Sequence, residues 1–202
     1  IVFANLTFAQ TRKTDYYEFK GNVQGVKDTT CLLAYYFGDK QFAKDTAEID
    51  SQGNFTFKGD EQLLHGMYMV VFPEGNYMEM VVTENEFSFK ANSEDLISSM
   101  EFNNSKENEK FYGYMQHLGS QQKILNNLNS QKEGASESEK KSIQSKIDAT
   151  TKVLIDFQNN FTNENSDILF SSILKSSKEI EIPDAPILEN GRPDSSFQYR
   201  YY

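Results

Sequence analysis

The residue types that most often carry chemistry are scarce in this chain. Cys31 is the single cysteine of 202 residues, so it can form neither an internal disulfide nor a C-x-x-C redox pair. It lies in the apolar run 29–37, which contains no His, Lys or Arg that could lower the pKa of the thiol. We therefore predict a buried structural thiol rather than a nucleophile.

The two histidines do not suggest a metal site. His65 precedes a predicted strand and His117 lies in a predicted helix, and neither belongs to a Cys, Asp or Glu pattern with ligand spacing. No pair of carboxylates can be assigned to a cleft, and no glycine-rich turn leads into a helix as phosphate binding requires. The sequence thus predicts no catalytic, cofactor-binding or metal-binding residue, and we expect this chain not to be an enzyme.

Tyrosines in the predicted strands are the remaining candidates for a site. Aromatic and Met side chains there could line a groove for a glycan or an apolar molecule, although packing in the core is the better explanation for most of them. A concave aromatic surface of this kind would lie near four residues: Tyr35, Tyr36, Tyr68 and Tyr77. We take these four as a possible ligand or partner surface.

Composition excludes some classes of partner. The chain has 30 acidic and 20 basic residues, a net charge of −10, and no cluster of Lys and Arg that could bind phosphates. We therefore expect no nucleic-acid partner. The 16 Phe and 11 Tyr residues suit the half-buried faces of β-strands.

The elements that must position these side chains change type in the middle of the chain. In residues 10–103 apolar and polar residues alternate with period two, which predicts seven or eight short strands joined by turns. Runs 29–37 and 66–72 are apolar on both faces and should be central, whereas the polar run 41–49 should lie near an edge. Gly21 interrupts the first strand and predicts a bulge there.

Residues 104–180 have the period of helices instead. Ser105 is a good N-cap, with Asn108 at the third helical position as a weakened capping box, and Ser136 with Glu139 forms a full one. Two amphipathic helices joined near Gly134 predict an antiparallel hairpin, and Ser166 should cap a third helix. The predicted fold class is α+β: an antiparallel β-sandwich or open barrel followed by an α-helical hairpin and a third helix.

The two ends of the chain suggest a longer, exported protein. Residues 1–9 are apolar, uncharged and end in Ala9, which resembles the remnant of a signal peptide and is too short to span a membrane. An ordinary apolar strand is the alternative. Residues 181–202 contain three prolines and predict an extended linker, and its aromatic, basic end 197–202 should meet a partner surface in a further domain.

Several motifs, taken in order, resemble a known family. They are Phe19-x-Gly21, Leu32-Leu-Ala-Tyr-Tyr36, Ala47-x-Ile-Asp-x-x-Gly-x-Phe-x-Phe57, Gly66-Met-Tyr-Met-Val-Val-Phe-Pro73 and Met100-Glu-Phe-Asn-Asn-Ser-Lys-Glu-Asn-Glu-Lys-Phe-Tyr112. Together they resemble the N-terminal domain of unknown function that precedes a thioredoxin-like domain in envelope proteins of Bacteroides-type bacteria. The end of the chain, 193–202, resembles the linking segment of those proteins.

The resemblance implies a parent protein of the thiol–disulfide oxidoreductase kind, located in the periplasm or cell envelope. Its redox cysteines would lie in the C-terminal domain, so no catalytic residue is carried over to this chain. We expect a non-catalytic accessory region that positions the redox domain, binds its client protein or associates with itself. The alternative is an independent β-sandwich of the cell envelope that binds a glycan or an apolar molecule.

Overall fold

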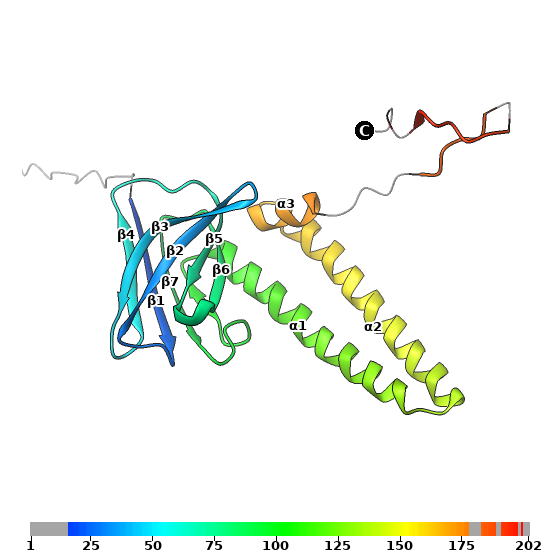
Figure 1. Cartoon of the computed structure of the whole chain (residues 1–202), viewed down its shortest axis with the longest axis horizontal. Coiled ribbons are helices and arrows are strands. Elements are labelled where there is room, and N and C mark those ends of the chain that lie inside the picture. Colours follow the sequence, from blue (N-terminus) through cyan, green and yellow to red (C-terminus); the bar gives the residue numbers. More distant parts are fainter. Residues whose placement is uncertain (1–15, 178–182, 189–190, 198, 200–202) are drawn as a thin grey trace, which may run out of the picture.

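The computed structural model describes residues 16–177, 183–188, 191–197 and 199. A β-sandwich is followed by a long helical hairpin that projects away from it, with a short third helix beside the base of the hairpin (Figure 1). This arrangement confirms the predicted α+β class, and the two sheets stay open at their edges rather than closing into a barrel.

One sheet of the sandwich has the strand order β4-β1-β7-β8. Its members are β1 (Tyr17–Gln24), β4 (Asn54–Gly59), β7 (Glu86–Asn92) and β8 (Glu101–Asn103). The β1–β7 pair is parallel, whereas the other two pairs are antiparallel. The antiparallel pattern is broken at this pair because the chain makes two strands of the other sheet between β4 and β7.

The second sheet has the order β3-β2-β5-β6. Its members are β2 (Thr29–Phe37), β3 (Lys40–Ile49), β5 (Gly66–Val71) and β6 (Tyr77–Val82), with the 3₁₀ turn η1 (Pro73–Gly75) between the last two. The two-faced runs β2 and β5 are central and the polar run β3 lies at an edge, as predicted. The pairing of β2 with β3 shifts its register between Leu33 and Ala34.

The bulge predicted at Gly21 is wrong. Gly21 stays in register with Phe55 on one side and Phe89 on the other. A Cβ atom at position 21 would lie 2.3 Å from Cζ of Phe55, so glycine is needed here because the aromatic ring lies over the backbone. The interruption of the apolar pattern marks a close approach of a side chain, which is a second reason for glycine in a strand.

The core lies between the two sheets and is rich in aromatic rings. Phe19 and Phe87 stack with their ring centroids 4.2 Å apart, and Phe55 meets Phe57 and Phe89 edge-on. Phe19 and Phe57 are wholly inaccessible to solvent. Each large apolar side chain buried in this way contributes about 1.5–3 kcal/mol to the free energy of unfolding.

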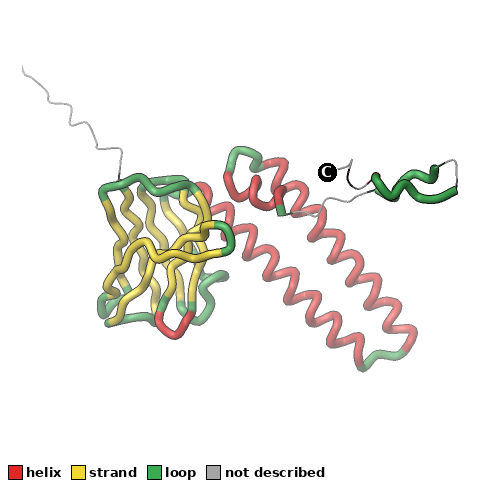
Figure 2. Tube along the Cα trace, turned by 45° about the horizontal axis from the view of Figure 1, so that its top comes forward, coloured by secondary structure: helices red, strands yellow, loops and turns green. Residues whose placement is uncertain are grey.

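Two helices of 28 residues form the hairpin, α1 (Lys106–Glu133) and α2 (Glu137–Glu164). At a rise of 1.5 Å per residue each is about 42 Å long, and Figure 2 shows them running side by side away from the sheets. The Ser105 hydroxyl accepts a hydrogen bond from the Asn108 backbone, and both bonds of the capping box between Ser136 and Glu139 are present. The predicted starts of both helices are therefore confirmed.

Packing along the hairpin weakens with distance from the sandwich. Near its base Tyr114 contacts Phe157 and Phe161, with ring centroids 5.5 and 4.9 Å away. Further out, Ile124 on α1 and Val153 on α2 leave 47% and 49% of their surface exposed. All the buried residues of α1 lie within its first nine positions, from Glu107 to Tyr114. The helical arm thus has a packed base and a solvated distal half.

The third helix, α3 (Leu169–Ser176), begins later than its predicted cap suggests. Ser166 does not cap it: the N-cap residue is Ile168, which has no side-chain capping bond. The Glu107 carboxylate of α1 instead accepts hydrogen bonds from the backbone N–H groups of Leu169 and Phe170, at 3.0 and 2.6 Å. The prediction of Ser166 was wrong because the cap comes from a residue distant in the sequence.

In the C-terminal segment the described residues turn back on themselves. Ile187 and Pro193 form an isolated β-bridge, and the Asp194 N–H donates to the Pro186 carbonyl at 3.0 Å. Ile187 is 66% exposed. The predicted signal-peptide remnant, residues 1–9, lies outside the described residues, and so do residues 198 and 200–202 of the predicted aromatic run.

Candidate interaction surfaces

The structure divides the four candidate tyrosines between two faces of one sheet. Tyr35 on β2 and Tyr68 on β5 are direct cross-strand partners, with ring centroids 5.8 Å apart. Phe42 on β3 extends this row, at 5.7 Å from Tyr35. Tyr68 is only 4% exposed, and its hydroxyl donates to the Leu64 carbonyl at 3.0 Å. These two tyrosines belong to the face that looks toward the other sheet, where burial raises the pKa of Tyr68.

Tyr36 and Tyr77 point to the outer face instead. Tyr36 follows Tyr35 along β2, and Tyr77 pairs with Val71, so both have the opposite parity to Tyr68. The Tyr36 hydroxyl donates to the Glu79 carboxylate at 3.0 Å, and Tyr77 is 55% exposed. The four residues therefore do not form a single aromatic groove.

Cys31 is buried on β2, as predicted. Its side chain is 1% exposed, and the thiol lies 3.8 Å from the Ala47 carbonyl, to which it donates. Burial raises the pKa of the thiol to about 12, against the smaller opposing effect of that hydrogen bond. Because the thiolate is the reactive form, this environment disfavours nucleophilic and redox chemistry at neutral pH.

The two histidines lie in different parts of the molecule. His65 is exposed at the start of β5, beside an open cleft of about 490 Å³ that Glu84, Lys106 and Asp167 also line. The ring of His117 stacks on Phe157 at 3.9 Å between the helices of the arm. In the part of the chain that the structure describes, no three His, Cys, Asp or Glu side chains gather as a metal site would require.

A buried amide joins the helical arm to the sandwich. Asn108 on α1 has no exposed surface, and its side chain faces Val81 on β6. The amide oxygen accepts from the Val81 N–H at 2.8 Å, and the amide nitrogen donates to the Val81 carbonyl at 2.7 Å. The side chain thus makes the two hydrogen bonds that a neighbouring strand would make.

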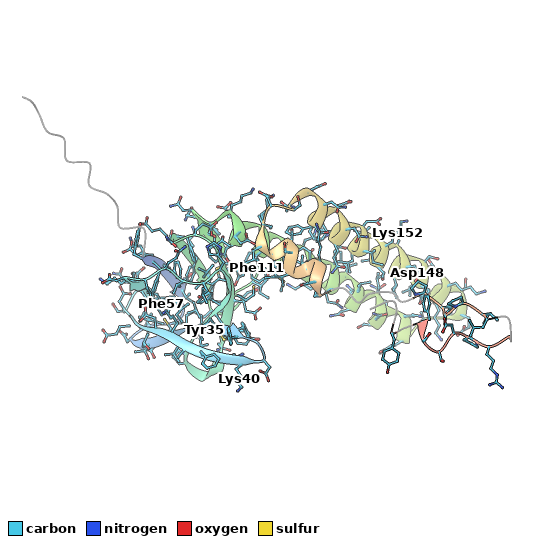
Figure 3. The ribbon with its side chains drawn as sticks, turned by 90° about the horizontal axis from the view of Figure 1, so that it is seen from above. Tyr35, Lys40, Phe57, Phe111, Asp148 and Lys152 are labelled. Carbon is cyan, nitrogen blue, oxygen red and sulfur yellow. The ribbon has the colours of Figure 1, made fainter. Side chains whose placement is uncertain are left out.

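Further polar contacts surround this amide. The Ser105 hydroxyl donates to the Glu84 carboxylate at 3.0 Å, and the Tyr112 hydroxyl donates to the Glu79 carbonyl at 2.8 Å. Lys106 forms an exposed ion pair with Asp167, just before α3. Figure 3 shows Phe111 at this junction, with Asp148 and Lys152 far out on the arm. The contacts fix the base of the arm to β6 and to α3.

An apolar groove opens beside the same edge of β6. Its volume is about 270 Å³, and its lining comes from β6, from the turn before β8 and from α1: Tyr77, Met78, Glu79, Leu96, Ile97, Phe111, Tyr112 and Met115. Gln116 of α1 holds the turn in place, because its side chain donates to the carbonyl of Ile97 at 3.0 Å. We refer to this feature as the edge groove.

A second cavity lies at the loop end of the sandwich. It has a volume of about 380 Å³ and is formed by the β1–β2 turn, the β5–β6 turn and the segment after β7, through residues such as Val26, Lys27, Phe72, Ser93 and Leu96. Its lining mixes apolar side chains with the hydroxyl groups of Thr29 and Ser93 and the ammonium group of Lys27. We refer to it as the loop-end cavity.

Sequence reasoning did not identify Asn108 and Glu107 as the residues that join the two parts. Both were visible in the first turn of α1, where acidic and amide side chains ordinarily serve the helix itself. The signal that could have found them is their position on the buried face, since Asn108 and Glu107 flank the apolar stripe that begins at Phe111.

Comparison with known proteins finds a family model that matches the sandwich. Residues 17–111 match the family model described as Domain of unknown function (DUF4369). This match covers the sandwich and the first residues of α1, and therefore includes the Asn108–Val81 contact. It supports the resemblance to a domain of unknown function that the sequence motifs indicate.

Among solved structures, the chain is similar to the crystal structure of a DUF3823 family protein from Parabacteroides merdae ATCC 43184. The two share 13% identity with a TM-score of 0.27, and the match covers 39% of this chain and 44% of that one. The chain thus spans less than half the length of that protein. No curated protein matches the chain. In the described residues, no helix has both the length and the apolar character to cross a membrane.

Proposed function

We propose that this chain is a non-catalytic interaction region, in which the sandwich holds the helical arm at a fixed orientation for a partner protein. The observation that carries the proposal is the pairing of the Asn108 amide with both backbone groups of Val81. A buried polar side chain with both of its groups satisfied favours one defined arrangement of two elements. Such a contact suits a region that holds other elements of a protein in a fixed position.

The use of the polar groups also supports this function. Catalysis needs polar groups that converge on a substrate, whereas Glu107 and Ser105 are buried in contacts with α3 and Glu84. The raised pKa of Cys31 disfavours redox chemistry at the one thiol of the chain. In this proposal the chain assists the redox reaction of another domain and catalyses no reaction itself.

The partner in this proposal is a thioredoxin-like domain that follows Tyr202 in the same protein, or a client of that domain. The support is the order of the sequence motifs, together with the family match of residues 17–111. The parent protein would be exported, with residues 1–9 as the remnant of its signal peptide. Its location would be the periplasm or the cell envelope.

Three measurements test the proposal. The gene sequence downstream of the codon for Tyr202 should encode a thioredoxin-like domain, and its absence would overturn this parent. In the whole protein, Asn108→Ala should slow reduction of a disulfide-bonded protein such as insulin and leave reduction of a small disulfide, such as oxidised glutathione, unchanged. Insulin reduction by residues 1–202 alone would contradict the non-catalytic function.

The loop-end cavity favours a second function, the binding of a small molecule. Its volume of about 380 Å³ falls within the range of about 300–1,000 Å³ that is usual for such sites. Lys27 and Phe72 both line the cavity and suit a ligand with an apolar body and a negative charge. Titration of the chain with aliphatic and aromatic carboxylates, followed by NMR, tests this alternative. Shifts confined to residues 25–29 and 93–96 would support it, and no shift at millimolar concentration would exclude this class of ligand.

A further inference from the structure

Every second residue of β6 points its backbone N–H and carbonyl groups to the free edge of the strand. The pairing with β5 and the hydrogen bonds to Asn108 show which residues these are. In an antiparallel pair, residues alternate between those that bond to the partner strand and those that point away from it. Val81 points away from β5, because its N–H and carbonyl bond to Asn108. Tyr77 and Glu79 have the same parity as Val81, so their backbone groups also point to the free edge.

Side chains of α1 occupy one end of this edge. Asn108 satisfies both groups of Val81, and the Tyr112 hydroxyl donates to the Glu79 carbonyl. Helix α1 thus takes the place of a neighbouring strand over this part of β6. The edge continues to Tyr77, where β6 is the last strand of its sheet among the described residues.

The remaining edge groups face the edge groove. They are the Glu79 N–H and both backbone groups of Tyr77, and Tyr77, Met78 and Glu79 are lining residues of the groove. The opposite walls are apolar and come from Ile97, which is 43% exposed, and Met115. The groove therefore combines open backbone donors and acceptors with an apolar wall, which is the combination by which a sheet edge binds a peptide strand.

The size and charge of the groove indicate what it would bind. Its volume of about 270 Å³ is below the range of about 300–1,000 Å³ typical of small-molecule sites, and suits the anchoring of side chains. Glu79 is the one charged residue among those that line it. The turn that forms its wall follows Glu94 and Asp95, and the chain as a whole carries a net charge of −10. A basic segment complements this surface.

We propose that the edge groove binds an extended segment of a partner protein, which adds a short strand to β6 at Tyr77 and Glu79. The segment carries an apolar side chain that lies between Ile97 and Met115, and a Lys or Arg that approaches the Glu79 carboxylate. This proposal rests on the interaction function above and names its site. The edge groove lies beside the sandwich, so the distal part of the arm remains available for the proposed thioredoxin-like domain.

The test uses the whole chain and a fluorescein-labelled peptide of alternating Lys and Val residues, followed by fluorescence anisotropy. The expected result is saturable binding that slows hydrogen exchange of the Tyr77 and Glu79 amides. A peptide N-methylated at alternate residues, on the edge that meets β6, should bind at least tenfold more weakly. A peptide with Glu in place of Lys should also bind at least tenfold more weakly.

Substitutions in the chain locate the binding. Tyr77→Pro removes an edge N–H that β5 does not use, and the extended conformation of Asn76 suits a following proline. Met115→Lys adds positive charge to the groove. Tyr77→Pro and Met115→Lys should each weaken binding at least tenfold. Val153→Lys on the arm is the matched control and should leave binding unchanged. If Tyr77→Pro does not fold, Met115→Lys decides.

The results that would overturn the edge site differ from those that would overturn the proposed function. No binding of the Lys–Val peptide, or equal binding by the Met115→Lys variant, would overturn the edge site. Equal binding of the N-methylated peptide would exclude strand addition. None of these results bears on whether a thioredoxin-like domain follows Tyr202 or whether Asn108→Ala slows reduction of a protein disulfide, so the broader function can stand when the edge site fails.

Discussion

The Asn108 side chain pairs with both backbone groups of Val81 and so replaces a strand at the edge of the sandwich. Since both residues are fully buried, the contact has no access to water that could take over its hydrogen bonds. It joins a helix to a sheet edge that would otherwise be open to association with other strands. The same edge is left open a few residues away, at Tyr77, where the edge groove lies.

Asn108→Ala should destabilise the chain by about 2–4 kcal/mol. The change leaves the Val81 N–H and carbonyl buried without partners, and each such group costs roughly 1–3 kcal/mol. Urea denaturation followed by circular dichroism measures the effect. Asn126→Ala, at an exposed position on the same helix, is the matched control and should change the free energy of unfolding by less than about 0.5 kcal/mol. Equal effects of the two substitutions would contradict the docking role of Asn108.

Glu107→Ala should release the start of α3. The carboxylate accepts from the N–H groups of Leu169 and Phe170, and loss of such a cap costs roughly 0.5–2 kcal/mol. Hydrogen exchange at these two amides should accelerate. Glu109→Ala removes an exposed carboxylate from the same turn of α1 and should leave both amides protected. Unchanged exchange in the Glu107 variant would show that α3 is held by its apolar contacts alone.

Gly21→Ala should destabilise the sandwich by about 1–3 kcal/mol, the usual cost of overpacking a core. The added Cβ would lie 2.3 Å from the Phe55 ring, which cannot move away easily because it also meets Phe57 and Phe89. Thermal unfolding measures the loss. Gly113→Ala in α1 is the opposite control: no atom lies within 4 Å of its added Cβ, and the change should stabilise the helix by roughly 0.5–1 kcal/mol.

The sequence predicts most reliably what depends on near neighbours. The caps at Ser105 and Ser136 follow from residues three positions apart, and the central place of β2 follows from its two apolar faces. The cap of α3 could not be predicted in this way, because Glu107 lies 62 residues before Leu169. Only the packing of α1 beside α3 brings the two together, and a local pattern holds no information on that packing.

The four tyrosines predicted as one surface could have been separated from the sequence alone. Tyr35 and Tyr36 share a residue type, but consecutive residues of a strand face opposite sides of a sheet. Strand parity alone could have separated them. The edge groove, in contrast, depends on how α1 lies along β6 and on the turn held by Gln116, and both are long-range contacts.

Cys31 gives the last prediction, which concerns both reactivity and pH. Since burial raises the pKa of the folded thiol to about 12, from a value near 9 in the unfolded chain, the folded state binds more protons between these limits. Its contribution to stability is therefore complete below about pH 9 and is lost as the pH rises toward 12.

Native protein at pH 8 should react with a thiol reagent such as dithionitrobenzoate only after unfolding, and urea should restore full labelling. Cys31→Ser should cost roughly 1–3 kcal/mol, because a hydroxyl replaces the thiol in an apolar site, and should weaken the fall in stability between pH 9 and 11. Rapid labelling of the folded chain at pH 8, or the same alkaline loss of stability in the serine variant, would show that the thiol is not held in the protonated, buried state from which the non-catalytic function is argued.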